Sequence, residues 1–545
     1  MKHFTALAIL ALLLSSTTVS QERSPVDTTL IHRIKQEGME HSRIMETLSW
    51  LTDVHGPRLT GSPQFRSAAR WAMHRLSEMG LSDVHMEGTP HVVKGWTLNR
   101  YYAMVTAPVA FPIISFPKAW SPPTNGRIRG RVMVGDPVND SVLSTYRGKL
   151  KGAFVLLGDL QNVEPHFKPE ATRRTDESLL ELANADLPAP RRPRRPREPD
   201  ARALLDYRFQ VMCLREGALA LLTPSRGDGG NVFVMGASVP SHPDTAFSRR
   251  PRSYEPDAPQ ILPQVVIAAE HYNRMTRMLN LGMPVEMEMQ LDVTFSRPDS
   301  AYNIVADLPG NDLRDEVVMV GAHLDSWHGG TGATDNGVGV ATCLEALRIL
   351  KTLGLAPRRT IRVAFWGGEE QGTWGSSSFV ERHLGTRSGR DTNATITYMP
   401  EAGKFSVYFN MDNGTGRFRG VYMQGNEAAR QVFREWLEPF GEYGASTLSL
   451  RNTGSTDHVA FDQIGLPAYQ FIQDDIEYFP RSWHSTMDVY DRAIEQDLKQ
   501  NAVMMASFAY LAASDPDRFP RKTPPGRVIG SQSGPAGTAG AGSGH

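Results

Sequence analysis

Histidines and carboxylates follow several apolar runs in the second half of the chain, directly where predicted strands end. His323 and Asp325 come after the run EVVMVGA, and Glu369 and Glu370 follow RTIRVAFWGG. Asp335 lies in a glycine-rich turn between these two segments. Because the carboxyl ends of parallel strands meet at one edge of a sheet, we expect these side chains to converge. The pattern predicts a site built from imidazole and carboxylate groups.

Two later segments extend this set of candidate residues. The segment FNMDNGTG contains Asp412, and FPRSWHSTMD contains His484 and Asp488. The spacing fits no short motif for a single zinc ion. Two histidines with four or five carboxylates suit a pair of divalent ions ~3.5 to 4 Å apart, bridged by one carboxylate and by a water or hydroxide. The chemistry that such a set supports is metal-assisted hydrolysis.

Each of these residues also has an ordinary structural explanation. An Asp before Asn-Gly commonly forms a turn, a Glu-Glu pair is commonly solvated, and a lone His is often a satisfied hydrogen-bonding group. A structural explanation would have to hold independently at every position, so their joint occurrence favours the metal site. The pair Asp457 and His458 leaves both alternatives open, because it fits a substrate pocket as well as helix capping and packing.

The elements that must position these residues alternate between strand and helix from Tyr302 onward. Apolar strand-like runs follow one another with the helical segment GVGVATCLEALRILKTLG among them, and a closing helix is predicted near 496–513. This alternation predicts an α/β fold with a mixed, mostly parallel sheet between layers of helices. The periodicity of residues 28–79 predicts helices broken by the turn-rich HGPRLTGSP.

Changes in composition divide the chain into five parts. We expect a signal peptide over residues 1–20, with Lys2 and His3 ahead of a short apolar run and small residues at the cleavage site. Residues 21–118 and 293–522 form the main domain, and 119–292 form a β-rich insert that contains the solvated Pro/Arg loop 188–200. Residues 523–545, rich in Gly, Ala and Ser, are expected to be a flexible tail outside the core.

Charge and cysteine content exclude several classes of protein. The chain has 58 basic and 59 acidic residues, so no global field attracts nucleic acid or anionic lipid. Its two cysteines, Cys213 and Cys343, form no metal cluster, and a disulfide between them is not favoured. The apolar run near the amino terminus is too short to span a bilayer. We therefore expect an exported protein, periplasmic or extracellular, without a membrane span.

The motif GAHLDSWHGGTGATDNGVGVATCLEAL, together with VAFWGGEEQGTWGS, resembles the dizinc exopeptidase family that includes bacterial aminopeptidases, glutamate carboxypeptidase and carboxypeptidase Q. The segments HLDSW and GEEQG are most similar to those of carboxypeptidase Q. The resemblance covers roughly residues 28–513, and the insert resembles a protease-associated domain. It implies the zinc exopeptidase fold and two zinc ions per chain.

The resemblance also implies a role for each residue that matches the family pattern. The implied metal ligands are His323, Asp335 as the bridging carboxylate, Glu370, Asp412 and His484. Glu369 matches the general base, which the residues support independently, because neighbours on a turn point in different directions. Asp325 is expected to orient His323, and Asp488 to orient His484. The family also places a cis peptide bond between Asp335 and Asn336.

One position departs from the family pattern and bears on substrate binding. Aminopeptidases of the family often carry Tyr just before the last histidine, as a donor to the oxyanion, whereas this chain has Trp483. The indole N–H is a donor, so the role is left open. His328, an additional imidazole, is interpreted as a surface or structural residue, with substrate contact as the alternative.

The predicted function is hydrolysis of peptide bonds in short peptides by a metal-bridging hydroxide, with Glu369 as the base. The residues do not choose between dipeptidase, carboxypeptidase and aminopeptidase specificity, and a homodimer is left open. Two rivals are a non-enzymatic binding protein that retains the fold, and a single-zinc glutaminyl cyclase. No implied ligand is replaced, which argues against the first, and the intact GEEQG and the large insert argue against the second.

Overall fold

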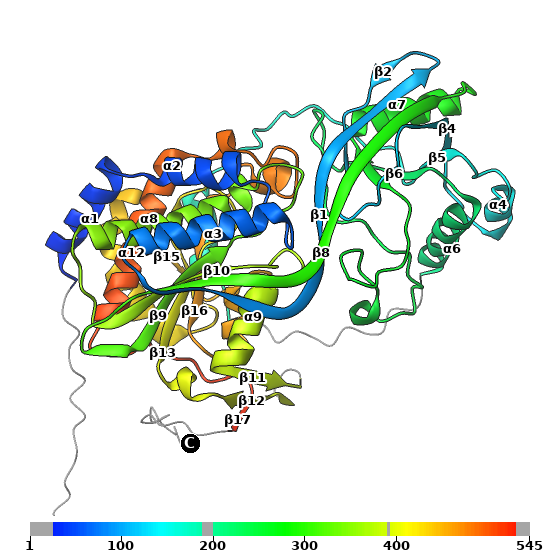
Figure 1. Ribbon diagram of the computed structural model, residues 1–545. Coiled ribbons are helices and arrows are strands. Elements are labelled where there is room, and N and C mark those ends of the chain that lie inside the picture. Colours follow the sequence, from blue (N-terminus) through cyan, green and yellow to red (C-terminus); the bar gives the residue numbers. More distant parts are fainter. Residues whose placement is uncertain (1–25, 188–199, 390–392, 530–545) are drawn as a thin grey trace, which may run out of the picture.

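The computed structural model describes residues 26–187, 200–389 and 393–529. The predicted signal peptide and all of the Pro/Arg loop except its last residue lie outside these ranges. Figure 1 shows two lobes joined by a pair of very long strands, β1 (Ser82–Ala107) and β8 (Glu286–Leu308), which pair antiparallel along most of their length. No helix in the described ranges is long and apolar enough to cross a membrane.

The predicted helical region near the amino terminus is confirmed. It forms α1 (Thr28–Glu40), α2 (Ile44–Ser49) and α3 (Pro63–Glu78). The Asp27 side chain accepts a hydrogen bond from the Leu30 N–H and so caps α1, and Ser62 caps α3 in the same way. The apolar faces of these helices pack into the main core of the first lobe.

The first lobe is a sandwich of helices around a mixed sheet, as the alternation of elements predicted. Along the sheet, the strands lie in the order β15 (Thr447–Ser449), β14 (Phe418–Tyr422), β16 (Ala468–Gln473), β13 (Phe405–Asn410), β9 (Leu313–His323), β10 (Arg359–Trp366) and β8. At its centre β9 is parallel to both β10 and β13. The carboxyl ends of these three strands therefore lie at one edge of the sheet.

Helices cover both faces of this sheet (Figure 1). Helices α8 (Val338–Thr352), α10 (Arg430–Leu437) and α12 (Glu495–Ser514) pack with α1 and α3 into one apolar core. On the other face, α9 (Trp374–Phe379) and α11 (His458–Asp462) close a smaller core. Cys343 is buried in α8 as a free thiol, and Cys213 is buried and free in the other lobe.

The second lobe, residues 111–285, is not simply β-rich. The four predicted strands are present as β4 (Ile128–Val134), β5 (Ala153–Leu156), β6 (Ala220–Pro224) and β7 (Gln264–Ile267), preceded by β2 (Phe111–Pro112) and β3 (Ser115–Pro117). Helices α4 (Asp140–Thr145), α5 (Asp176–Ala183), α6 (Ala201–Glu216) and α7 (Ala269–Asn280) occur among them. Apolar runs in the sequence indicate the strands. The helices α4, α5 and α6 bury only one or two residues each and so leave no such run.

Strands of both lobes belong to one sheet of 14 strands, because β4 pairs with the amino-terminal part of β8.

The prediction of a flexible tail over residues 523–545 also needs correction. Residues Arg527–Ile529 form β17, which pairs in parallel with β12 (Thr395–Tyr398), and β12 pairs with β11 (Gly385–Ser388). Backbone pairing does not require large apolar side chains, which explains why composition alone was misleading here.

Candidate metal centre and active site

The predicted site residues converge at the carboxyl ends of the central strands. His323 is the last residue of β9, and Glu369 and Glu370 lie in the turn after β10. Asp412 follows β13 by two residues, and Asp335 lies with non-helical backbone in a short turn, Ala333–Gly337, before α8. His484 comes from the loop after another such turn, Tyr478–Ser482. The peptide bond between Asp335 and Asn336 is cis, as the resemblance implied.

Two groups of side chains form, and they share Asp335. In the first, His323 Nε2 lies 3.2 Å from Asp335 Oδ1 and 3.7 Å from Asp412 Oδ1. In the second, His484 Nε2 lies 3.3 Å from Asp335 Oδ2 and 3.0 Å from Glu370 Oε2. The candidate ligand atoms of each group all lie within 4.8 Å of one another. The two oxygens of Asp335 therefore face different groups, as a bridging carboxylate does.

The hydrogen bonding of these groups fits divalent cations. Three buried atoms, His323 Nε2, Asp335 Oδ2 and Glu370 Oε1, have no hydrogen-bond partner among the described residues. A buried polar atom without a partner costs about 1–3 kcal/mol. Imidazole nitrogens with carboxylate oxygens are the ligands that zinc takes in catalytic sites. One cation in each group would satisfy these atoms.

The electrostatics of the site point the same way. Burial lowers the pKa of His484, but Glu370 and Asp335 outweigh this effect and raise the pKa to about 10. Burial and the nearby Asp335 carboxylate raise the pKa of Glu370 to about 7. Several buried acids thus repel one another and raise the pKa of the His484 imidazole. Cations that replaced those protons would relieve the repulsion.

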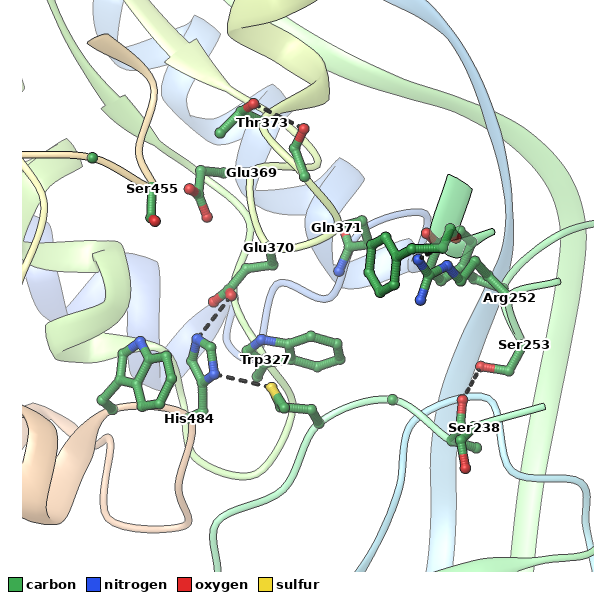
Figure 2. A pocket seen from close by; sticks show the side chains of 18 of the residues that line it. Ser238, Arg252, Ser253, Trp327, Glu369, Glu370, Gln371, Thr373, Ser455 and His484 are labelled. Carbon is green, nitrogen blue, oxygen red and sulfur yellow. Dashed lines mark hydrogen bonds and ion pairs between the residues drawn. The ribbon is translucent and has the colours of Figure 1, made fainter. Parts of the chain in front are cut away.

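Glu369 lies beside these groups without belonging to either of them. Burial raises its pKa well above the usual range, and the Asp457, Asp412 and Glu370 carboxylates act in the same direction against the lowering effect of His323. Its backbone N–H donates to Asp325 Oδ1 over 3.2 Å. Figure 2 shows the Glu369 and Glu370 side chains as neighbours in the cavity. Glu370, and not Glu369, belongs to one of the two ligand groups.

Asp325 approaches His323 through its backbone carbonyl and its carboxylate. The His323 Nδ1 atom lies 3.0 Å from the backbone oxygen of Asp325 and 3.7 Å from its Oδ1 atom. The carboxylate also accepts hydrogen bonds from Thr60 and from the backbone N–H groups of Glu369 and Glu370. The expected orienting role of Asp325 stays a prediction, and its backbone carbonyl lies closer to the ring than its carboxylate. The Asp325 carboxylate supports the Glu369–Glu370 turn.

Asp488 does not contact His484 as expected. Its Oδ1 atom accepts hydrogen bonds from the Thr334 N–H over 2.5 Å and from the Thr334 hydroxyl over 2.8 Å. Asp488 thus holds the residue next to Asp335. The neighbour of His484 Nδ1 is the sulfur of Met235, 3.1 Å away, a residue from the second lobe that no sequence signal marked.

The aromatic and polar wall of the site includes one residue that the sequence argument named and three that it did not. The Trp483 ring stacks on His484 with 3.8 Å between ring centroids. Tyr478, six residues before His484, lines the same cavity, as do Trp327 and Gln371. The indole nitrogen of Trp327 and both amide atoms of Gln371 are buried without a partner among the described residues.

Asp457 and His458 lie at the start of α11, but neither caps it with its side chain. Asp457 Oδ1 accepts a 2.5 Å hydrogen bond from the Ser376 hydroxyl, and burial raises the pKa of Asp457 to about 7. The His458 Nε2 atom lies 3.2 Å from the Thr453 carbonyl. His328 is also structural, since it is buried with Nε2 2.7 Å from the Pro117 carbonyl. None of these three residues lines the cavity.

The metal-ligand groups open into a cavity of about 1310 Å³ that both lobes line. From the first lobe come Glu369, Glu370, Asp412 and His484, and the second lobe contributes the segment 235–254. In Figure 2, Gln371 lies between Glu370 and Arg252, and Trp327 lies beside His484. Arg252 forms no ion pair with a carboxylate in the part of the chain that the structure describes. The cavity thus brings the metal ligands and the Arg252 side chain to one space.

Comparisons with known proteins agree with this geometry. The model of "Peptidase family M28" matches residues 303–509. Mouse carboxypeptidase Q is 27% identical over 490 residues, which are 89% of this chain and 88% of that protein. The crystal structure of a peptidase M28 precursor from Shewanella amazonensis has a TM-score of 0.63 and 22% identity, and the match covers 91% of this chain and 99% of that one.

A second solved structure shares the fold at lower similarity. It is described as a zinc aminopeptidase from Bacillus subtilis, with a TM-score of 0.53 and 19% identity, and the match covers 88% of this chain and 98% of that one. The family model covers β9, β10 and β13 together with all five candidate ligands. Residues 303–509 therefore match peptidase family M28, and the chain is a metallo-exopeptidase.

Proposed function

We propose that this protein is an exported exopeptidase that binds two zinc ions and hydrolyses short peptides. The observation that carries the proposal is the position of Asp335, whose two oxygens face two separate histidine–carboxylate groups. Support for zinc comes from the donor atoms and from the solved zinc aminopeptidase with the same fold. Export rests on the leader-like residues 1–20.

In this proposal His323 and Asp412 hold one ion, Glu370 and His484 hold the other, and Asp335 binds both. Bound there, the ions supply Lewis-acid polarisation of the peptide carbonyl and lower the pKa of an attacking water. The chain's own residues then provide geometry. The Asp325 carbonyl fixes the ring of His323, and the Asp325 carboxylate fixes the turn that bears Glu369 and Glu370.

Glu369 is proposed to take a proton from the attacking water and to give it to the leaving amine. Its raised pKa falls when cations occupy the adjacent ligands, because positive charge stabilises the carboxylate. A base whose pKa lies near the working pH is efficient in both directions of proton transfer. This role needs no metal bond, which agrees with its place outside both ligand groups.

Glu369→Gln tests this role because glutamine keeps the size and loses the base. We expect unchanged zinc content and a kcat lowered by about 10²- to 10⁴-fold. Glu427→Gln, at an exposed glutamate in the first lobe, is the matched control and should keep full activity. Near-normal turnover by Glu369→Gln would contradict the assignment.

Elemental analysis of the purified protein tests the metal count. Two zinc ions per chain are expected. One ion per chain would favour the glutaminyl cyclase chemistry instead, and the formation of cyclised product from peptides with amino-terminal Gln would identify it. Loss of zinc content in His323→Ala together with His484→Ala would tie the ions to these two groups.

The substrate proposal follows from the cavity. Gln371 and Trp327 line it with buried polar atoms that lack partners among the described residues, and these atoms match the donors and acceptors of a peptide group. Arg252 on the opposite wall suits a free carboxylate. Together with the similarity to carboxypeptidase Q, this favours short peptides with both ends free, and aminopeptidase action is the second candidate.

Blocked dipeptides separate these specificities. If both ends are recognised, an acetyl group on the amine and an amide on the carboxylate should each abolish cleavage. Cleavage of the amidated peptide alone would indicate an aminopeptidase, and cleavage of the acetylated peptide alone would indicate a carboxypeptidase. Cleavage of both blocked peptides would contradict recognition of either end.

A further inference from the structure

The loop that bears His484 is held by both lobes. His484 has a φ of 56°, in the left-handed region that residues with a Cβ atom rarely adopt. A backbone conformation of this kind persists only where surrounding contacts determine it. The first lobe holds the flanks of this loop, through Thr334 at Ser482 and at Asp488, and the contacts nearest His484 come from the second lobe.

Those contacts come from the segment Asn231–Met235 of the second lobe. The Val234 N–H donates to the His484 carbonyl over 2.8 Å, and the Thr486 N–H donates to the Val232 carbonyl over 2.9 Å. Phe233 and Ser485 form an isolated antiparallel bridge between these bonds. The two segments therefore pair like a short piece of sheet, with His484 inside the paired region.

Side chains reinforce this pairing at both ends. The Asn231 amide donates to the Arg481 carbonyl over 2.7 Å, and its Oδ1 atom accepts from the Thr486 hydroxyl over 3.3 Å. The Thr486 hydroxyl oxygen in turn accepts from the Val232 N–H over 3.2 Å. The segment of the second lobe thus fixes the backbone on both sides of the ligand.

Met235 fixes the ring itself. The His484 Nε2 atom faces Asp335 and Glu370, so a cation bound there occupies its lone pair and leaves the hydrogen on Nδ1. The Met235 sulfur lies 3.1 Å from Nδ1 and is the acceptor for that hydrogen. Metal-bound histidines generally donate their second N–H to a carboxylate, carbonyl or water. A thioether is a weaker and softer acceptor than any of these.

We propose that the segment Asn231–Met235 makes the second lobe a working part of the metal centre, with Met235 as the positioning residue that orients His484. The proposal rests on the proposed metal-binding role of His484. It assigns the second lobe a function beyond shaping the cavity, because its segment Asn231–Met235 holds both the backbone and the ring of His484.

The test measures metal binding without substrate, so that a contact between Met235 and a peptide cannot affect it. Met235→Leu keeps the length and removes the acceptor, whereas Met235→Gln supplies a carbonyl acceptor at similar reach. Met283→Leu is the control, since Met283 is a comparably exposed methionine of the same lobe, 45% against 47%. Competition with a chromophoric chelator gives the zinc dissociation constants of the full-length chain.

We expect Met235→Leu to lower the affinity for one of the two zinc ions about tenfold and to leave the affinity for the other unchanged. This loss is at the lower end of the range for partners of metal-bound histidines. Met235→Gln should restore the affinity, and Met283→Leu should match the wild type. Unchanged zinc affinity in Met235→Leu, or an equal loss in Met235→Gln, would overturn the role of the sulfur. A wild-type protein that binds no zinc would instead overturn the proposed function.

Thr486→Val tests the backbone pairing separately, because valine keeps the shape and removes both hydroxyl hydrogen bonds. It should lower the affinity for the same zinc ion that Met235→Leu affects. The thermal unfolding of the zinc-free protein reports whether the fold is intact. Weaker binding of both ions to an equal extent would contradict a specific action on His484. Unchanged zinc affinity in Thr486→Val would overturn the role of the paired segment.

Discussion

Arg58 is expected to hold the loop between two metal ligands, and its replacement should reveal this. The side chain is fully buried, and its guanidinium donates to four carbonyls. The distances are 2.7 Å to Leu324, 3.0 Å to Leu51, 3.0 Å to Thr331 and 2.7 Å to Gly332. Three of these carbonyls belong to the loop that connects His323 to Asp335.

The cost of Arg58→Met follows from these bonds. The variant leaves four carbonyls without their donor, at about 1–3 kcal/mol each where water cannot reach them. Methionine avoids the cost of burying a charge, and burial already lowers the pKa of Arg58 to about 10, which offsets part of the loss. We expect the free energy of unfolding to fall by about 3–5 kcal/mol, as when one partner of a buried charged network is removed.

Urea titrations followed by tryptophan fluorescence would measure this change, and zinc competition would measure the effect on the site. Arg359→Met is the matched control. Arg359 is buried to a similar degree, but its partners Glu316, Asp515 and Pro516 lie near the other end of β10. Both variants should lose stability, and only Arg58→Met should also lose zinc affinity. A change below about 1 kcal/mol with unaltered zinc binding would refute the reasoning.

Three further outcomes are expected. Chelation should abolish peptidase activity and lower the unfolding temperature, and zinc should restore both. Burial lowers the pKa of His328 from 6.5 to about 4, so the stability it contributes is present above pH 6.5 and is lost towards pH 4. His328→Gln should remove about 3 kcal/mol of this acid dependence in urea titrations of zinc-free protein. Tyr478→Phe should lower kcat more than it changes KM if its hydroxyl, and not the Trp483 indole, assists the oxyanion.

The sequence by itself determined which residues meet. A polar residue that directly follows an apolar strand must lie at the edge of a parallel sheet, so His323, Glu370 and Asp412 could be grouped from their local surroundings. The helices at 28–79 and the central strands also followed from periodicity, because burial on one face leaves its trace in neighbouring residues. These features depend on short stretches of chain.

Only the tertiary structure decided how those residues are held. The sulfur of Met235 at His484, the carboxylate of Asp325 under the Glu369 turn, and the carbonyls around Arg58 all join segments that lie far apart in the chain. Such contacts depend on the directions of individual side chains and on how two lobes dock. A one-dimensional pattern carries no record of either, since the same residue types serve equally well as surface, core or support.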